Sequence, residues 1–189
     1  MSVLTLEKPK LTTDELIEKL YQTEGKAEII NGKIVEFMST GDIPGSTAAN
    51  ILLSLMLFQR KSKFGRAYGD NVGFLVNLSN RKSFSPDVSF FTGERSGMKF
   101  LQGSPIFAVE VRSENDYGKK AEEAIKQKRY DYFAAGTEIV WDVDLLSEDV
   151  IKSYHRANPD DPKIYKRGEI ADAESALPGW KIPVDELFE

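Results

Sequence analysis

The sequence contains no cysteine. This absence excludes disulfide bonds, thiol catalysis and zinc sites built on sulfur, and it is compatible with a reducing compartment. Long hydrophobic runs are also missing, since the longest, ILLSLMLF at residues 51–58, is too short to cross a bilayer. The opening residues, MSVLTLEKPK, lack the apolar core of a signal peptide. We therefore expect a cytoplasmic protein that makes no contact with a membrane.

An excess of positive charge is absent as well. The 189 residues carry a formal net charge of −5, so the surface as a whole does not indicate nucleic-acid binding. Any such role must come from a local basic patch or from a metal ion. The hydrophobic fraction of 41% is enough for one core, and the length fits one domain better than two. We predict a single domain over residues 1–189, with residues 1–11 as a flexible arm.

Hydrophobic periodicity and turn residues divide the chain into helices and strands. Thr12 and Glu15 form a capping-box pattern at the start of a first helix, and Asn31-Gly32 between two apolar runs predicts a tight hairpin. The succession of strand, helix and strand over residues 105–144 predicts a crossover unit with parallel strands. The expected fold is α/β, with one mixed β-sheet flanked by helices. Further helices are expected at 46–64 and 117–135, and strands at 66–78, 84–92, 105–113, 137–144, 149–155 and 162–167.

Glu110 lies in the middle of PIFAVEVRS, an apolar strand over residues 105–113 whose other members indicate burial on both faces. A carboxylate there is costly unless it is neutralised, paired or bound to a metal. An ion pair with Arg112, or with an arginine from elsewhere in the chain, is the structural alternative. Glu110 therefore marks either a buried ion pair or a functional site.

Lys128 is the second unusual residue. A rotation of about 100° per residue places it near the centre of one face of the 117–135 helix. A lysine on an apolar face either extends its amine to solvent or meets a carboxylate. Because this helix packs back across the sheet in a crossover unit, Lys128 can approach Glu110. The other members of that face are Ala121, Ala124, Ile125, Tyr132 and Ala135.

Asp87 follows a proline at the start of the strand in SFSPDVSFF. Taken alone, it fits a strand-end aspartate that caps a neighbouring amide. If the strands at 84–92 and 105–113 are neighbours, Asp87 and Glu110 converge, and two carboxylates plus a backbone carbonyl suit Mg²⁺ or Mn²⁺. Lys128 beside them would orient a water molecule or stabilise developing negative charge on a phosphate.

The remaining polar groups have ordinary interpretations. Glu28, on the predicted hairpin, is expected to be solvated. Asp142 and Asp144 are expected to be structural and to lie on the far side of the helix from Asp87 and Glu110. The end of the second helix carries a basic cluster that fits either a solvated helix end or a contact with nucleic-acid phosphate, namely Arg60, Lys61, Lys63 and Arg66.

The order of these motifs resembles the Uma-type restriction endonuclease family, a branch of the PD-(D/E)XK superfamily. The resemblance runs over nearly the whole chain, through AEIINGKI, the PD that contains Asp87, EVRS, the Lys128 helix, EIVWDVD and LPGWKIPVDELF. It implies a restriction-endonuclease-like fold and a metal-dependent endonuclease that hydrolyses phosphodiester bonds in DNA. By this resemblance, Asp87, Glu110 and the Val111 carbonyl would bind Mg²⁺ or Mn²⁺. Asp87, Glu110, Lys128 and Glu28 would form the catalytic set.

Two positions bear on how far the resemblance extends. Arg112 stands where many superfamily members have the catalytic lysine, which the Uma-type pattern supplies from the following helix. Many family members carry a histidine near residues 44–46, where this chain has Pro-Gly-Ser. Two alternatives therefore stay open: a non-catalytic module that keeps the nuclease fold and binds nucleic acid or protein, and a hydrolase of another phosphorylated substrate. Symmetric double-strand cutting would favour a homodimer, which no sequence feature requires.

Overall fold

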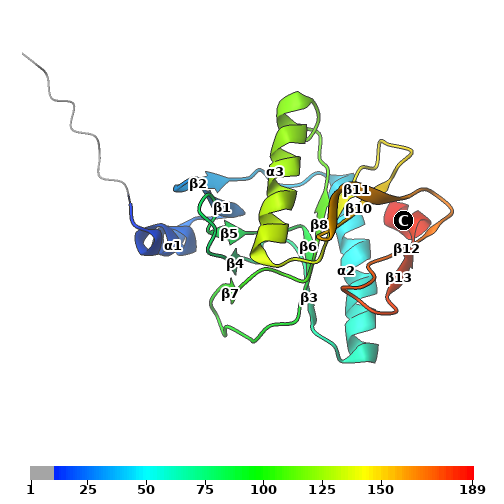
Figure 1. Cartoon of the computed structure of the whole chain (residues 1–189), viewed down its shortest axis with the longest axis horizontal. Coiled ribbons are helices and arrows are strands. Elements are labelled where there is room, and N and C mark those ends of the chain that lie inside the picture. The colour runs from blue at the N-terminus through cyan, green and yellow to red at the C-terminus, as the bar shows by residue number, and fades with distance from the viewer. Residues whose placement is uncertain (1–10) are drawn as a thin grey trace, which may run out of the picture.

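The structure is a computed structural model that describes residues 11–189 (Figure 1). The arm predicted for residues 1–11 lies outside the described residues, apart from Leu11, which is exposed. None of the helices in the described part is long and apolar enough to cross a membrane. The described chain contains three α-helices, a six-stranded sheet and three smaller sheets.

The elements follow one another along the chain in the predicted alternation. The helices are α1 (Thr13–Gln22), α2 (Asp42–Ser62) and α3 (Lys119–Ala135), with the 3₁₀ helix η1 (Val184–Phe188). The strands are β1 (Ala27–Ile30), β2 (Lys33–Glu36), β3 (Arg66–Tyr68), β4 (Phe74–Leu75), β5 (Ser83–Phe84), β6 (Val88–Phe91), β7 (Leu101–Gln102), β8 (Phe107–Val111), β9 (Ile139–Val143), β10 (Ile151–His155), β11 (Asn158–Tyr165), β12 (Ile170–Asp172) and β13 (Lys181–Pro183).

The two local motifs near the start of the described chain form as predicted. The Thr12 hydroxyl accepts a hydrogen bond from the Glu15 N–H at 3.3 Å, and the Glu15 carboxylate accepts one from the Thr12 N–H at 2.7 Å, which caps α1. Asn31 and Gly32 connect β1 to β2 with φ angles of +50° and +70°. A two-residue hairpin requires positive φ at both positions, and asparagine and glycine adopt it more easily than other residues.

The central sheet is built around the predicted crossover. Its strand order is β11-β10-β9-β8-β6-β3, with β8 and β9 parallel and the other neighbours antiparallel. The register places Glu110 beside Asp142 on β9, and Val109 opposite Val88 on β6. Parallel neighbours joined by α3 confirm the strand–helix–strand prediction for residues 105–144.

Two predicted strands are each divided in the structure, and the strand predicted at 162–167 instead runs over Asn158–Tyr165. The segment predicted as one strand over 66–78 divides into β3 and β4, since the chain turns at Asn71, which has a φ of +60°. The segment over 84–92 divides into β5 and β6 around Pro86, which lacks the N–H that a continuous strand needs. Because β4, β5 and β7 form a separate sheet, Asp87 lies where the chain passes from this small sheet into the central one.

Helix α2 covers one face of the central sheet. Ile51 and Leu55 on its inner side are fully buried in the same core as Val109 and Trp141. The segment over β12, β13 and η1 packs on this face too, so the predicted packing of the last apolar segment is confirmed, and it includes Leu177 and Trp180.

The ends of α2 differ from the prediction by a few residues. The helix begins at Asp42 rather than Ser46, and Pro44 lies in its first turn, where a missing N–H removes no intrahelical bond. It ends at Ser62, with Lys63 rather than Gly65 as the left-handed C-cap, at φ of +54°.

Helix α3 covers the opposite face of the sheet (Figure 1), and all of its buried residues lie in its C-terminal half. Tyr132 and Phe133 belong to the same core as Ala108, whereas Ala124 is exposed. The predicted apolar stripe is therefore wrong for the first half of the helix, which extends beyond the sheet. Lys128 lies at the boundary, with its side chain 17% exposed.

Candidate active site

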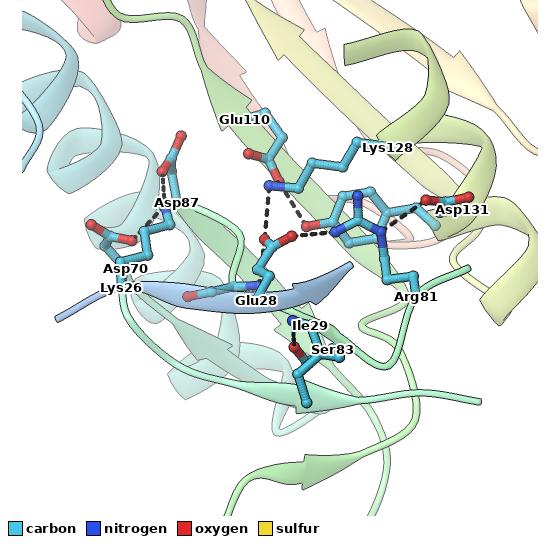
Figure 2. A network of polar contacts seen from close by, with 12 residues as sticks. Lys26, Glu28, Ile29, Asp70, Arg81, Ser83, Asp87, Glu110, Lys128 and Asp131 are labelled. Carbon is cyan, nitrogen blue, oxygen red and sulfur yellow. Dashed lines mark hydrogen bonds and ion pairs between the residues drawn. The ribbon is translucent and has the colours of Figure 1, made fainter. Parts of the chain in front are cut away.

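Three predicted site residues, Glu28, Glu110 and Lys128, meet beneath α3, and Asp87 lies to one side of them, paired with Lys26 (Figure 2). Successive β8 side chains alternate, so that Glu110 faces α3 while Val109 and Val111 face α2. The amine of Lys128 lies 2.8 Å from Glu110 Oε1 and 3.0 Å from Glu28 Oε1. The crossover geometry thus brings the helix lysine to the strand carboxylate and adds a second carboxylate to the same amine. We name the acid–lysine cluster by its members, Lys26, Glu28, Asp87, Glu110 and Lys128.

Glu28 is buried, so the expectation that it is solvated is wrong. Its side chain is 0% exposed, because β1 packs beside β5 and the side chain turns inward under α3. One carboxylate oxygen is bound by the Arg81 guanidinium, and the other accepts the Ser85 N–H at 2.9 Å as well as the Lys128 amine. Burial raises the pKa of Glu28, but Lys128 and Arg81 outweigh it and hold that pKa below its usual range. Glu28 is a buried anion that fixes the position of Lys128.

Arg81 connects this carboxylate to α3. Its Nε lies 2.8 Å from Asp131 Oδ2 (Figure 2). Asp131 Oδ1 accepts hydrogen bonds from Asn80 and Gln127, both at 2.9 Å. Arg81 lies in a predicted turn and belongs to no periodic pattern, so the sequence provides no signal for it. The buried chain of charges ties the β1–β2 hairpin to α3 and thereby sets the position of Lys128 along the helix axis.

Glu110 is held by α3 through one of its two oxygens. The Tyr132 hydroxyl donates to Oε1 at 2.7 Å, and Lys128 contacts the same oxygen. Within residues 11–189, no hydrogen bond or ion pair engages Oε2. Burial raises the pKa of Glu110, Lys128 offsets this only in part, and Asp87 raises it further. The charge of this partly buried acid is therefore incompletely compensated.

Asp87 is paired with a lysine that the sequence does not single out. Lys26, just before β1, contacts Asp87 Oδ1 and lies 2.7 Å from Asp70 Oδ1. The other Asp87 oxygen accepts the Val111 N–H at 2.8 Å, so the strand-end capping role considered for this aspartate is also present. Burial lowers the pKa of Lys26, but the carboxylates of Asp87 and Glu110 outweigh burial and raise it above its usual value.

The donor atoms of this cluster are chemically suited to a divalent cation. Asp87 and Glu110 offer carboxylate oxygens, which Mg²⁺ and Mn²⁺ prefer, and each acid already faces an ammonium group. Glu28 has both oxygens engaged and does not extend the set. No group of three or more histidine or acidic side chains in the described part of the chain has the arrangement of a metal site. The Val111 carbonyl stays a prediction, since the contact seen here is through its N–H.

Arg112 does not pair with Glu110, so that alternative is wrong. Its guanidinium binds both Asp142 oxygens at 2.7 Å and contacts both oxygens of Glu122 on α3. Because Glu110 and Asp142 are neighbours in register, Asp142 lies under α3 beside Glu110 and not on the far side of the helix. We call Arg112, Glu122 and Asp142 the arginine cluster.

The predicted nucleic-acid contacts lie away from the acid–lysine cluster. Arg66 pairs with Phe91 at the C-terminal end of β6, whereas Asp87 precedes the N-terminal end of that strand. At about 3.3 Å per residue, the length of β6 separates the two sites by about 13 Å. The structure does not bring this basic cluster to the carboxylates, and its other members are exposed at the end of α2, namely Arg60, Lys61 and Lys63.

Comparisons with known proteins agree with this architecture. A crystal structure described as a "putative nuclease belonging to DUF820" from Anabaena variabilis aligns with a TM-score of 0.71 and 14% sequence identity, over 92% of this chain and 97% of that chain. At that identity the likeness shows the fold, a mixed α/β architecture as expected from the sequence. No curated protein matches the chain. Since the family model described as "Uma2: Putative restriction endonuclease" matches residues 14–185, the protein belongs to that family.

Proposed function

We propose that this protein is a metal-dependent endonuclease that hydrolyses phosphodiester bonds in DNA. The observation that carries the proposal is that Lys128 contacts Glu110 while Asp87, from a third segment of the chain, lies near enough to raise the pKa of Glu110. Ionisable groups with perturbed pKa values gather at functional sites more often than elsewhere. Membership of a restriction endonuclease family supports the class of reaction.

Asp87 and Glu110, with the Val111 carbonyl, would hold Mg²⁺ or Mn²⁺. When bound, such a cation neutralises phosphate charge and makes water a stronger nucleophile at neutral pH. The Val111 N–H orients Asp87 through its 2.8 Å hydrogen bond, and Tyr132 orients Glu110. These contacts leave Oε2 of Glu110 free of protein partners within residues 11–189, as a cation ligand requires.

Lys128 would act on the reacting phosphate or on the attacking water. Burial lowers the pKa of its amine, but Glu110 and Glu28 raise it above its usual value, so the side chain stays charged at neutral pH. A fixed ammonium group stabilises negative charge that develops on phosphate oxygens. Glu28 is a positioning residue in this proposal, because it contacts the lysine and has no oxygen left for substrate.

Plasmid nicking in the presence of Mg²⁺ or Mn²⁺ tests the proposal. We expect Asp87→Ala and Glu110→Ala each to abolish nicking, since each removes a proposed cation ligand. Asp160→Ala is the matched control, because Asp160 is an exposed acid that pairs with Lys126 away from the cluster. If both cluster variants cut as well as the wild type, the activity belongs to a contaminant and the proposal is refuted.

A non-catalytic module with the nuclease fold is the second candidate. The observation in its favour is that Lys26 and Lys128 pair with Asp87 and Glu110, so each acid already has a positively charged partner within the protein. Calorimetry with Mn²⁺ separates the two functions. An endonuclease of the proposed kind binds the cation and loses that binding in Asp87→Ala, whereas the module shows no binding that depends on Asp87.

A further inference from the structure

The outer face of α2 combines exposed apolar side chains with opposite charges at its two ends. Leu53 and Leu57 are 58% and 57% exposed, and Met56 is 40% exposed. They point away from Ile51 and Leu55, which the helix buries against the sheet. Single exposed leucines are common, but adjacent ones along a helix form a contiguous apolar surface of the kind that proteins use to bind one another.

Size and charge are distributed along this face in a regular order. The N-terminal half presents small residues, Gly45, Ser46 and Ala49, and the C-terminal half presents the large ones. Asp42 lies on the face in the first turn, and Arg60 lies on it in the last turn. We define the outer face of α2 by these residues, which are Asp42, Gly45, Ser46, Ala49, Leu53, Met56, Leu57 and Arg60.

We infer that the outer face of α2 binds the same face of a second copy of this chain, in an antiparallel pair with two-fold symmetry. When the pair is centred at the level of residue 51, Asp42 lies opposite Arg60 of the second copy. Ala49 lies opposite Leu53 of the second copy. The small pair Gly45 and Ser46 then faces the large pair Met56 and Leu57.

Three physical effects favour this partner over an unrelated one. Large side chains meet small ones, so the two helices can approach closely without a gap or a clash. The antiparallel direction places the positive N-terminus of each helix dipole near the negative C-terminus of the other. Two-fold symmetry repeats every contact, so the pairing of Asp42 with Arg60 occurs twice.

Among residues 11–189, no other element covers the large side chains of this face. The C-terminal segment contacts α2 beside it, where the Thr47 hydroxyl donates to the Leu187 carbonyl at 2.8 Å and the Trp180 indole donates to Ser54 at 3.1 Å. Helix α3 and the acid–lysine cluster lie on the opposite side of the sheet (Figure 1). The dimer therefore leaves both clusters facing outward, and it assigns Arg60 to the interface rather than to phosphate.

Analytical ultracentrifugation of the full-length chain tests the inference by measuring dimer formation in variants that reverse the charge of Asp42 or of Arg60. We expect the wild type to form a dimer that dissociates on dilution. Asp42→Arg and Arg60→Asp should each weaken the dimer at least about tenfold, because each variant alone places like charges opposite one another twice. An equimolar mixture of the two variants should restore association, since every Asp–Arg contact is then present across the mixed interface.

Leu53→Glu should also yield monomers, and Leu146→Glu is its matched control, because Leu146 is 84% exposed and lies outside α2. Circular dichroism of each variant reports whether it stays folded. A monomeric wild type at the highest soluble concentration overturns the inference. A dimer that Leu53→Glu leaves intact, or a variant mixture that associates no better than either variant alone, overturns it as well.

Discussion

Two groups of charges, each partly buried, lie side by side at α3 and differ in how completely the charges are paired. In the arginine cluster, one guanidinium bonds all four oxygens of Asp142 and Glu122. In the acid–lysine cluster, the Lys128 amine contacts one oxygen of Glu110 and one of Glu28. The effect on the acids is opposite: the hydrogen bonds from Arg112 lower the pKa of Glu122, whereas burial raises the pKa of Glu110.

The difference follows from the shape of the cation. A guanidinium is a planar fork that serves two carboxylates at once, so its acids need nothing further. An ammonium group is a compact point charge, and here it leaves Oε2 of Glu110 without a bond within residues 11–189. The arginine cluster therefore has the properties of a structural element, and the acid–lysine cluster is the one that we propose to bind a cation.

Substitution of the lysine is expected to have the largest effect and to separate function from stability. Lys128→Met should lower the nicking rate by about 10²–10³-fold, because a fixed positive charge near the phosphate is lost. Glu28 keeps Arg81 as its partner and Glu110 can take up a proton, so the fold should persist. Single-turnover nicking and Mn²⁺ calorimetry measure the two effects. Full activity in this variant would remove Lys128 from the catalytic set.

Substitution of the arginine should give the opposite result. Arg112→Met leaves Asp142 buried without a counter-charge, so the free energy of unfolding should fall by about 3–5 kcal/mol, while the folded protein keeps its nicking rate. Urea unfolding measures the change, and the exposed Arg95→Met is the control, with an expected change within about 0.5 kcal/mol. A stability near that of the wild type would show that the arginine cluster is not the structural element we describe.

The pH dependence of cation binding sharpens the same contrast. A cation competes with a proton at Glu110, whose pKa is raised. The affinity for Mn²⁺ should therefore keep rising with pH beyond the usual pKa of a carboxyl group, by up to about tenfold per pH unit. Glu110→Gln should weaken binding and flatten this dependence. In the metal-free protein, Glu110 contributes to stability at pH values below the pKa that it has in the unfolded chain. This contribution is lost as the pH rises through the higher pKa that it has in the folded protein. An affinity that does not change across this range would contradict the assignment of Glu110 as a ligand.

Removal of the second lysine should have the smallest effect. Lys26→Met eliminates the ammonium group that competes for Asp87, so Mn²⁺ affinity should increase about fivefold, equivalent to about 1 kcal/mol. Lys82→Met, which removes an exposed lysine bonded to Asn77, should leave the affinity unchanged. Weaker binding in Lys26→Met would show that this lysine orients Asp87 for the cation instead of competing with it.

Much of the fold was predictable because its signals are local. The Thr12 capping box and the Asn31-Gly32 turn depend on residues within a few positions of one another. The approach of Lys128 to Glu110 follows from one crossover unit, whose handedness and packing are nearly invariant. The divided strands were missed because alternating apolar residues continue past Asn71 and Pro86, although the chain changes sheet there.

The sequence alone determined the family, the order of the elements and the positions of Asp87, Glu110 and Lys128, since these depend on short patterns and on one well-constrained connection. Only the tertiary structure decided that Glu28 is buried, that Arg81 ties it to Asp131 and that Lys26 pairs with Asp87. Those contacts join residues about 50 to 60 positions apart in the chain. Nothing in a local pattern specifies which charges meet at such a separation, because the packing of the hairpin and the small sheet under α3 brings them together.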